Sequence, residues 1–292
     1  MANLKTIKTK IKSVSNLKKI TRALEVVSTV KLQKLKSQAD ALKWYLVDLM
    51  TIVSTVGQYH AIFEDKKSTG SNKSLVVIFT SERGLCGGLN SKLHRKVTAE
   101  SKDKEVEYFV IGKKWLEYFK RVGANIVWSL HIGDNFSEED LLPLFTFFDT
   151  SLASGEYGEV KLYFNYFKNS IMQIPTSMEL YPFRQTSFEA FLADIDVEIT
   201  PPVIGNKDLM IEPTVSEYMV ELRRQIRNFV ISSALVQNKT GEHAARMIAM
   251  KNAKDNATEF AKSLKLTFNK ARQWAITQEI SEIVSAKIAI EN

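Results

Sequence analysis

The sequence Leu4-Lys-Thr-Ile-Lys-Thr-Lys-Ile-Lys-Ser-Val14 opens a stretch, residues 3–56, that contains neither glycine nor proline. Apolar residues recur in this stretch at spacings of three and four, as in Leu17, Ile20, Leu24 and Val27. This spacing predicts one amphipathic helix with an a/d stripe. At 1.5 Å per residue the helix would be about 80 Å long, which exceeds the diameter of a small domain. Much of it must therefore pack on another long helix or on a partner.

The end of the chain predicts a second long helix. Thr214 is followed three residues later by Glu217, which is the pattern of a capping box. Beyond this point only Gly241 is expected to interrupt the helix, and the apolar stripe is rich in Ala, Ser and Thr. We therefore expect residues 1–60 and 212–292 to form a long antiparallel coiled coil with a thin seam.

The middle of the chain, residues 74–205, alternates between strand and helix patterns. Short apolar runs predict strands at residues 75–79, 108–111, 124–130, 159–167 and 177–182. Helices are predicted between them at residues 113–121 and 137–153. Such alternation is typical of a parallel-type α/β sheet. The expected fold class is therefore α/β, with a Rossmann-like domain inserted between the two long helices.

The loop Ser81-Glu-Arg-Gly-Leu-Cys-Gly-Gly-Leu-Asn90 follows the first predicted strand, where Rossmann-like domains bind phosphate. The glycines of this loop are Gly84, Gly87 and Gly88. Their spacing matches neither the Walker A motif nor GxGxxG. One interpretation is a nucleotide or thiol site with Cys86 as nucleophile, for which His94 is the nearest base. The other, which we favour, is a structural loop whose glycines supply positive φ and close packing.

The charge of the chain is unevenly distributed. The formal net charge is +7, and residues 1–60 alone carry 11 basic and 3 acidic side chains. A basic track on the first predicted helix consists of Lys5, Lys8, Lys10, Lys12, Lys18, Lys19, Arg22, Lys31, Lys34 and Lys36. One explanation is an acidic partner, whether nucleic acid, an anionic membrane or acidic protein loops. The other is a solvated helix face that keeps the protein soluble, and composition leaves both open.

Composition excludes several kinds of site. With one cysteine, the chain has no internal disulfide and no multi-cysteine metal site. Its four histidines are widely separated, so a zinc centre is not expected. The sequence has no run of about 18 apolar residues, so no membrane span is predicted. The first residues also lack the apolar core of a signal peptide. We predict a protein without catalytic residues, metal or cofactor of its own.

Three motifs resemble the gamma subunit of F-type ATP synthases, the central rotor shaft. The first is Leu4-Lys-Thr-Ile-Lys-Thr-Lys-Ile-Lys-Ser-Val-Ser-Asn16 with Lys19-Ile-Thr-Arg-Ala23, and the second is the loop 81–90. The third comprises Glu242-His-Ala-Ala-Arg-Met-Ile-Ala-Met-Lys-Asn-Ala253 and Asn269-Lys-Ala-Arg-Gln-Trp-Ala-Ile-Thr-Gln-Glu-Ile-Ser-Glu-Ile-Val284. They occur in the family's order over essentially the entire chain, so the sequence is identified as a member of this family.

The resemblance implies a shaft inside a hexamer of alternating alpha and beta subunits. These partners would bind ATP, ADP and Mg²⁺, so no cofactor is bound directly by the shaft. The α/β domain and the lower coiled coil would contact the epsilon subunit and the c ring. Each orientation of the turning shaft would favour particular beta-subunit conformations. The resemblance also implies a peripheral protein on the cytoplasmic side of a bacterial membrane, attached only through the c ring, with no nucleic-acid partner.

The resemblance also assigns individual residues. Three of them match the segment that hydrogen-bonds the loop region of the beta subunit: Arg272, Gln273 and Thr277. Leu24 lies where the family usually has methionine and would face the same region. The basic track, together with Arg272, would complement an acidic beta-subunit loop, while Ile288 and Ile290 suit an apolar sleeve. Coiled-coil packing or solvation is the alternative for any single one of these residues.

Several residues depart from the family pattern. The stretch from Val26 to Val30 is bulkier, Trp274 replaces a usually small residue, and the loop 205–211 lacks the aromatic residues often seen there. The rotor of a diverged F-type-like motor with another output therefore stays open. So do a coiled-coil scaffold and a nucleic-acid binder, whose binding would fall steeply with salt. The first 36 residues, however, hold no aromatic side chain for stacking on bases.

Overall fold

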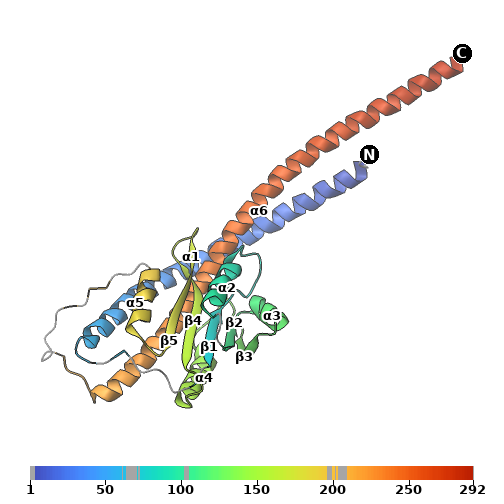
Figure 1. Ribbon diagram of the computed structural model, residues 1–292. Helices are drawn as coiled ribbons and strands as arrows, with labels where there is room; N and C mark the ends of the chain where they lie inside the picture. Colours follow the sequence, from blue (N-terminus) through green and yellow to red (C-terminus); the bar gives the residue numbers. More distant parts are fainter. Residues whose placement is uncertain are drawn as a thin grey trace. The chain divides into compact units, whose positions relative to one another are not determined.

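The computed structural model contains two long helices and a five-stranded sheet (Figure 1). It describes residues 4–60, 62–63, 71, 73–101, 105–195, 199–200, 202 and 209–291, without the side chains of 288 and 291. Most of the loop 205–211 and the side chain of Ile288 therefore lie outside the described residues. Among the described residues, no helix combines the length and apolar character that a membrane span requires.

The elements follow the predicted order closely. They are α1 (Leu4–Gly57), β1 (Ser74–Phe79), α2 (Leu89–Glu100), β2 (Val106–Ile111), α3 (Lys113–Arg121), β3 (Asn125–Leu130), the 3₁₀ turn η1 (Glu138–Leu141), α4 (Leu142–Ala153), β4 (Glu159–Phe167), β5 (Gln173–Tyr181), α5 (Gln185–Asp194) and α6 (Val215–Glu291). The predicted helix 137–153 is thus divided into η1 and α4, because Pro143 stands at the start of α4 and supplies no backbone N–H to a preceding turn. Helix α5 was not predicted.

The chain divides into two compact units, and both long helices contribute to each. The two-helix unit comprises Met1–Ser28 and Arg246–Asn292, and the sheet unit comprises Thr29–Ala245. The predicted segments 1–60, 74–205 and 212–292 follow the pattern of residues along the chain. The compact units depend instead on which segments contact one another, so each long helix is divided between the two units.

The sheet has the strand order β3-β2-β1-β4-β5. Strand β1 pairs in parallel with both β2 and β4, and β2 pairs in parallel with β3, as the α/β pattern predicts. Strand β5 is antiparallel to β4. The connection 168–172 between these two strands is too short for the crossover that a parallel pair requires. The sheet is therefore mixed rather than purely parallel, and β5 begins four residues before the predicted strand.

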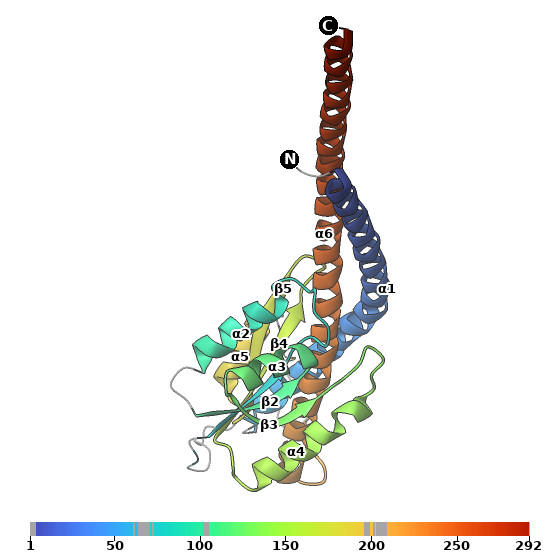
Figure 2. The ribbon, with the colours of Figure 1, turned by 90° about the vertical axis from the view of Figure 1, so that its right-hand side faces the viewer.

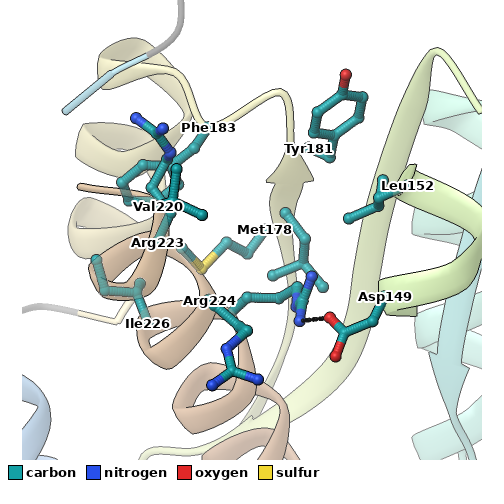
Figure 3. Close-up of a pocket in the computed structure, with 11 residues that line it drawn as sticks. Asp149, Leu152, Met178, Tyr181, Phe183, Val220, Arg223, Arg224 and Ile226 are labelled. Carbon is teal, nitrogen blue, oxygen red and sulfur yellow. Dashed lines mark hydrogen bonds and ion pairs between the residues drawn. The ribbon is translucent and has the colours of Figure 1, made fainter. Parts of the chain in front are cut away.

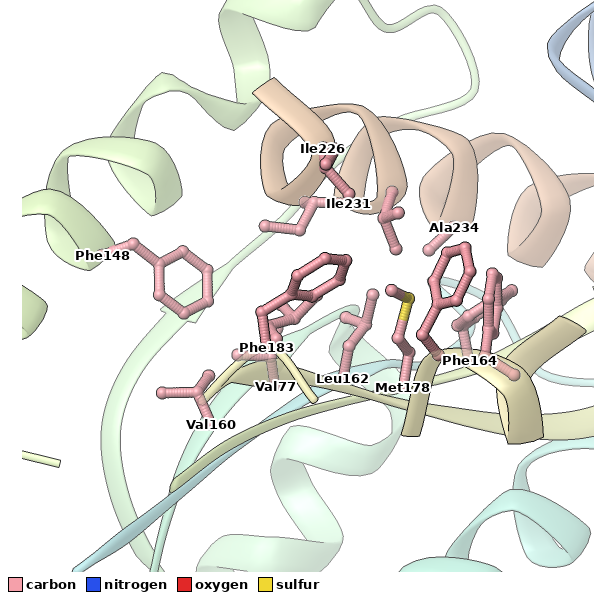
Figure 4. Packing of buried hydrophobic residues seen from close by; sticks show 14 of the residues in the cluster. Val77, Phe148, Val160, Leu162, Phe164, Met178, Phe183, Ile226, Ile231 and Ala234 are labelled. Atoms are coloured by element: carbon pink, nitrogen blue, oxygen red, sulfur yellow. The ribbon is translucent and has the colours of Figure 1, made fainter. Parts of the chain in front are cut away.

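Helices cover both faces of the sheet, because the strand side chains alternate between the faces. Val77, Leu162 and Met178 point toward α6, where Ile226, Ile231 and Ala234 pack against them (Figure 4). The C-terminal part of α1 completes this larger cluster, together with α4 and α5. On the opposite face, α2 and α3 enclose a smaller cluster with alternate residues of β1 and β2. The C-terminal end of β1 lies beside α6, because Asn238 of α6 donates a hydrogen bond to Thr80 O.

In the two-helix unit, the ends of α1 and α6 run antiparallel and side by side in both views (Figures 1 and 2). The buried seam residues include small and polar side chains: Thr21, Ser28 and Ala257, with Ile7 and Met250. Lys254 Nζ donates to Glu25 Oε2 at 2.8 Å across the seam. The predicted coiled-coil pairing and its thin seam are both present.

Helix α6 begins as predicted and then passes through Gly241 without a break. Thr214 Oγ1 accepts a hydrogen bond from Glu217 N at 3.3 Å, which is the N-cap bond of the expected capping box. The carboxylate of Glu217 accepts from the Thr214 hydroxyl, Oγ1 to Oε2 at 2.8 Å, where a full capping box has it accept from the backbone N–H. The expected interruption at Gly241 is absent. A Cβ at this position would lie 3.3 Å from Gln173 Cγ, so the glycine allows close packing on the start of β5.

Candidate functional site

The loop that follows β1 is a closed turn. Asn90 Nδ2 donates to Ser81 Oγ at 2.7 Å, and Asn90 Oδ1 accepts from Ser81 N at 3.2 Å. Of its three glycines only Gly87 has a positive φ, 59°. The expectation that the glycines supply positive φ therefore holds for Gly87 and not for Gly84 or Gly88, and Leu85 takes the second left-handed position, at φ 66°.

Cys86 does not form a catalytic pair with His94 in this loop. The thiol is buried, with Cys86 Sγ 3.6 Å from Ser81 Oγ. The ring of His94 instead stacks on Trp115 at 4.7 Å between centroids, and burial lowers its pKa. A nucleophilic thiol needs an adjacent base or cation to form the thiolate. The described geometry supports the structural interpretation of the loop.

A turn and a half of α6 occupies the edge of the sheet where doubly wound folds bind ligands. Five of its side chains bond the loops and strand ends at this edge, and we call them the polar clamp: Gln237, Asn238, Lys239, Glu242 and His243. All five residues are at most 4% exposed. A buried polar group without a hydrogen-bond partner costs about 1–3 kcal/mol if it is neutral, and more if it is charged. Each of these five side chains must therefore be paired.

The two amides of the polar clamp bind β4 and the end of β1. Asn238 Oδ1 accepts from Asn165 N at 3.2 Å and Asn165 Nδ2 at 3.0 Å. Asn238 Nδ2 donates to Thr80 O at 3.4 Å. Gln237 Oε1 accepts from Phe167 N at 3.2 Å, and Gln237 Nε2 donates to Ala39 O of α1 at 3.5 Å. One stretch of α6 is thereby fixed to two strands and to α1.

The charged members of the polar clamp bind the loops that follow β1 and β3. Lys239 Nζ donates to Ile132 O at 2.5 Å. The carboxylate of Glu242 accepts hydrogen bonds from Glu82 N and Arg83 N, each at 3.4 Å. His243 Nε2 lies 3.1 Å from Asp134 Oδ1. The loop 81–90 is thus held to α6 by a carboxylate.

Asp134 connects the polar clamp to α1. Its carboxylate pairs with Lys31 of α1 on one oxygen and with His243 of α6 on the other. Burial alone would raise the pKa of Asp134, but the hydrogen bond from Lys31 and the positive charges of His243, Lys31 and Lys239 lower it to about 2. Sequence reasoning placed Lys31 in the basic track and missed Asp134, because no local pattern links residues 103 positions apart.

A second polar site is a cavity of about 300 Å³ between α4, β5 and the start of α6 (Figure 3). Met178 and Leu180 form part of its apolar lining. Each of its three arginines has a bonding partner: Arg227 Nη2 pairs with Asp149 Oδ1 at 2.5 Å, Arg224 Nε with Glu221 Oε2 at 2.9 Å, and Arg223 Nη1 donates to Ile62 O at 3.3 Å. Neither this cavity nor the polar clamp presents a nucleophile beside a base. Among the described residues there is also no group of three metal-ligating side chains.

The basic track lies along α1. Nine of its ten side chains are exposed, and Lys31, which pairs with Asp134, is half-buried. Residues Lys5 to Arg22 belong to the two-helix unit, and Lys31 to Lys36 belong to the sheet unit. The exposed charges are available to an acidic partner, and they equally fit the solvated face that composition left open.

The structure places the remaining site residues of the two-helix unit on separate stretches. Arg272, Gln273 and Thr277 are exposed, and Thr277 Oγ1 donates to Gln273 O at 2.9 Å. Leu24 is half-buried, and its neighbour Glu25 pairs with Lys254. Lys254 precedes Arg272 by about 27 Å of helix. Leu24 and the group around Arg272 therefore do not form one site within this chain.

An exposed apolar row lies on the last part of α6; the family resemblance pointed to the end of this row, at Ile290, and its earlier members Ile276 and Ile280 were not predicted. Its members are between 47% and 84% exposed: Ile276, Ile280, Ile283, Val284 and Ile290. The spacing of three and four from Ile276 to Ile283 is a signal that the sequence already contains. In the views of Figures 1 and 2 this part of α6 continues past the described end of α1. Contiguous exposed apolar side chains mark a surface that a partner covers.

Comparison with known proteins identifies relatives over the full length of the chain. The family model described as ATP synthase matches residues 3–290. The ATP synthase gamma chain of Ruthia magnifica subsp. Calyptogena magnifica is 35% identical over 299 residues, covering 99% of this chain and 100% of the relative. The ATP synthase gamma chain of Stenotrophomonas maltophilia (strain K279a) is 37% identical over 300 residues, with the same coverage.

Two solved structures have the same fold. A chain of the Euglena gracilis mitochondrial ATP synthase structure (OSCP/F1/c-ring) matches with a TM-score of 0.64 and 18% identity, covering 98% of this chain and 94% of that one. A chain of the Tetrahymena thermophila mitochondrial ATP synthase central stalk/c-ring structure matches with a TM-score of 0.61 and 22% identity, covering 80% and 99%. The helices and mixed sheet described above are therefore shared with both chains.

Proposed function

Because this chain belongs to the ATP synthase gamma-chain family, we propose that it is the central-stalk rotor of an F-type ATP synthase. In this role it couples ion-driven rotation of a c ring to ATP synthesis or hydrolysis at the beta subunits. A hexamer of alpha and beta subunits surrounds its long helices, and epsilon and the c ring bind on the side of the α/β sheet. It is peripheral to the cytoplasmic side of a bacterial membrane, attached only through the ring.

The observation that carries this proposal is the exposed apolar row of α6. Apolar side chains exposed on one helix over several turns favour a covering partner, and an apolar sleeve of surrounding subunits supplies that cover. Apolar contacts are non-directional, unlike hydrogen bonds with a fixed geometry. A helix can therefore turn within such a sleeve without breaking a set of oriented bonds at each step.

The exposed part of the basic track supports a second contact, with acidic loops of the beta subunits. Nine exposed cations along one helix create a positive field, and Arg272 adds another on α6. Complementary charge guides an acidic loop toward the shaft from any of several rotational positions. Each orientation of the shaft then stabilises one beta-subunit conformation over the others by differential contact energy.

The polar clamp supports a non-catalytic role for this chain. In doubly wound folds the crevice at the C-terminal ends of the strands is the place where a nucleotide binds. Here the side chains of α6 occupy that edge and bond the groups that would face a ligand. The chain accordingly binds no cofactor directly, and ATP, ADP and Mg²⁺ are held by the alpha and beta subunits.

The polar clamp also has a mechanical role in the proposal. It bonds α6 to β4, to α1 and to the loops that follow β1 and β3. These bonds differ in direction, so no single sliding movement of α6 leaves them intact. A torque applied to the sheet is consequently passed to this part of α6 instead of being lost in local slippage.

The proposal is tested by gentle purification from native membranes through a tag on this chain, followed by quantitative mass spectrometry. One copy of this chain with three alpha, three beta, epsilon and the c ring is the expected result. Alpha- and beta-like chains without the ring would instead identify the rotor of a diverged motor with another output. If no hexamer is retained, the rotor proposal is wrong, and salt-dependent binding to nucleic acid becomes the next test.

A further inference from the structure

The two edges of the sheet differ in how they are protected against pairing with another strand. Strand β5 at one edge contains Pro175, which lacks a backbone N–H, and the charged Glu179, which pairs with Arg184 at 3.2 Å. Proline and charged residues are the usual devices that keep an edge strand from adding a further strand. Strand β3 at the other edge, Asn125–Leu130, contains neither a proline nor a charged residue.

The backbone of β3 has bonding groups directed away from the sheet. Leu130 O accepts a hydrogen bond from Gly112 N at 2.9 Å, so the bonding groups of Leu130 face β2. Because successive residues of a strand alternate, the N–H and C=O of Ser129 point outward. Ser129 is exposed, and Trp128 beside it is 50% exposed. No strand among the described residues pairs with this side of β3.

A groove of about 670 Å³ runs along this open edge between β3 and α3. Leu116 and Ile126 contribute apolar side chains to its lining, and Lys120 contributes a positive charge. Arg121, next in the chain, is also exposed. The groove therefore favours side chains of two kinds on an incoming strand: apolar groups over Leu116 and Ile126, and a carboxylate near Lys120.

We infer that β3 is a docking edge for an extended strand of a partner subunit, which carries apolar residues and an acidic residue and adds to the sheet beside Ser129. The inference rests on the proposed function, since the occupant belongs to the same assembly. Strand addition fits a rotor because backbone hydrogen bonds hold the partner in a fixed register. The joint would therefore move with the sheet, in contrast to the apolar row of α6.

The first experiment compares amide hydrogen exchange, at single-residue resolution, in the isolated full chain and in the tag-purified complex. The Ser129 amide is expected to exchange at least about tenfold more slowly in the complex. The Leu130 amide, which faces β2, should be protected in both samples and serves as the internal control. Equal exchange at Ser129 in the two samples would overturn the inference. Concentration-dependent protection in the isolated chain would assign the edge to a second copy instead.

The second experiment uses a matched pair of variants in the complex. Ser129→Pro removes the outward N–H, whereas Ser129→Ala keeps it, and both leave the Leu130 bond to Gly112 in place. Ser129→Pro is expected to release one partner chain about tenfold more readily during purification, and Ser129→Ala should retain it. Lys120→Glu, which leaves the backbone untouched, should weaken the same partner and guards against misfolding of the proline variant.

The outcomes separate this inference from the proposed function. If tag purification retains no alpha and beta chains, the rotor proposal fails. If it retains them and neither Ser129→Pro nor Lys120→Glu weakens any partner, the rotor proposal stands and the docking edge is wrong.

Discussion

Two stretches of the same helix, α6, have opposite surroundings. Residues 237–243 are buried in the sheet unit, and the five side chains of the polar clamp bond four different parts of the chain. Residues 272–290 lie in the two-helix unit and are almost entirely exposed. The first stretch is polar although it is buried, and the second carries large apolar residues although it is exposed. The usual inside–outside distribution is thus reversed twice along one helix.

The reversal fits the proposed rotor function. Buried polar groups cost stability unless every one is paired, but when paired they allow only one arrangement of neighbouring elements. Exposed apolar groups are satisfied by any apolar surface and impose little direction on it. A helix that must be held rigidly at one place and turn freely at another needs these two kinds of surface. Substitutions in the polar clamp should therefore lower the free energy of unfolding more than substitutions in residues 272–290.

The largest loss of stability is expected for Asn238→Ala. The substitution leaves Asn165 N and Thr80 O without their buried partner and opens a small cavity. The free energy of unfolding should fall by about 3 kcal/mol, measured by urea denaturation of the full chain. Gln273→Ala, an exposed amide on the same helix, is the matched control and should change it by less than about 0.5 kcal/mol. A similar small change in both would show that the polar clamp does not hold α6.

A smaller and pH-dependent loss is expected for Asp134→Asn. The pKa of Asp134 in the folded chain is lowered from 3.8 to about 2, so its ionised form contributes stability at neutral pH that is lost as the pH falls toward 2. At pH 7 the variant should be about 1–2 kcal/mol less stable than the wild type. Urea unfolding at a series of pH values should show this difference closing at acidic pH. A difference that is constant with pH would contradict the ionic role of Asp134.

A still smaller effect is expected for Lys254→Ala in the two-helix unit. This substitution removes the pair with Glu25, whose two side chains are 24% and 19% exposed. Partial exposure weakens the pair, so the loss should be about 0.5–1 kcal/mol. Lys251→Ala, an exposed lysine three residues earlier, should have almost no effect when both variants are measured by urea denaturation. A loss as large as that of Asn238→Ala would mean that the two units are held equally firmly.

The smallest change in stability is expected for the double variant Lys8→Ala with Arg272→Ala, since both side chains are exposed. The free energy of unfolding of the isolated chain should stay within about 0.5 kcal/mol of the wild type. In the assembled complex, ATP-driven ion pumping or assembly should decrease, because the proposal places these two charges opposite acidic loops of the beta subunits. Lys92→Ala on α2 is the control outside the basic track. Normal assembly and pumping in the double variant would remove the electrostatic role of the track.

Most of the fold can be predicted because its signals are local. The spacing of Leu4, Ile7 and Ile11 indicates a helix wherever that helix packs, and the apolar run of β1 indicates a buried strand. The N-cap Thr214, indicated by the Thr214–Glu217 spacing, gives the start of α6 to the residue. The misses are equally physical. Gly241 continues α6 and packs closely on Gln173, and this contact between distant residues cannot be read from the local cost of a glycine in a helix.

The candidate site was less predictable. Lys31 looks like its neighbours in the basic track, yet it pairs with Asp134, while the nine others remain exposed. Asp134 and His243 are 109 positions apart, and no spacing rule connects them. The end of the apolar row, at Ile290, was predicted from the family resemblance, whereas Ile276 and Ile280 were not, because helical spacing alone does not tell whether an apolar side chain is buried or exposed.

The sequence by itself determined the two long helices, the α/β alternation, the concentration of positive charge on α1 and the family of the chain, because periodicity, composition and motifs depend on neighbouring residues. Only the tertiary structure decided which charges are paired, that α6 fills the ligand edge of the sheet, that β5 runs antiparallel and that β3 keeps an open edge. These features depend on groups brought together from distant positions, and their energies arise only when both partners are in place.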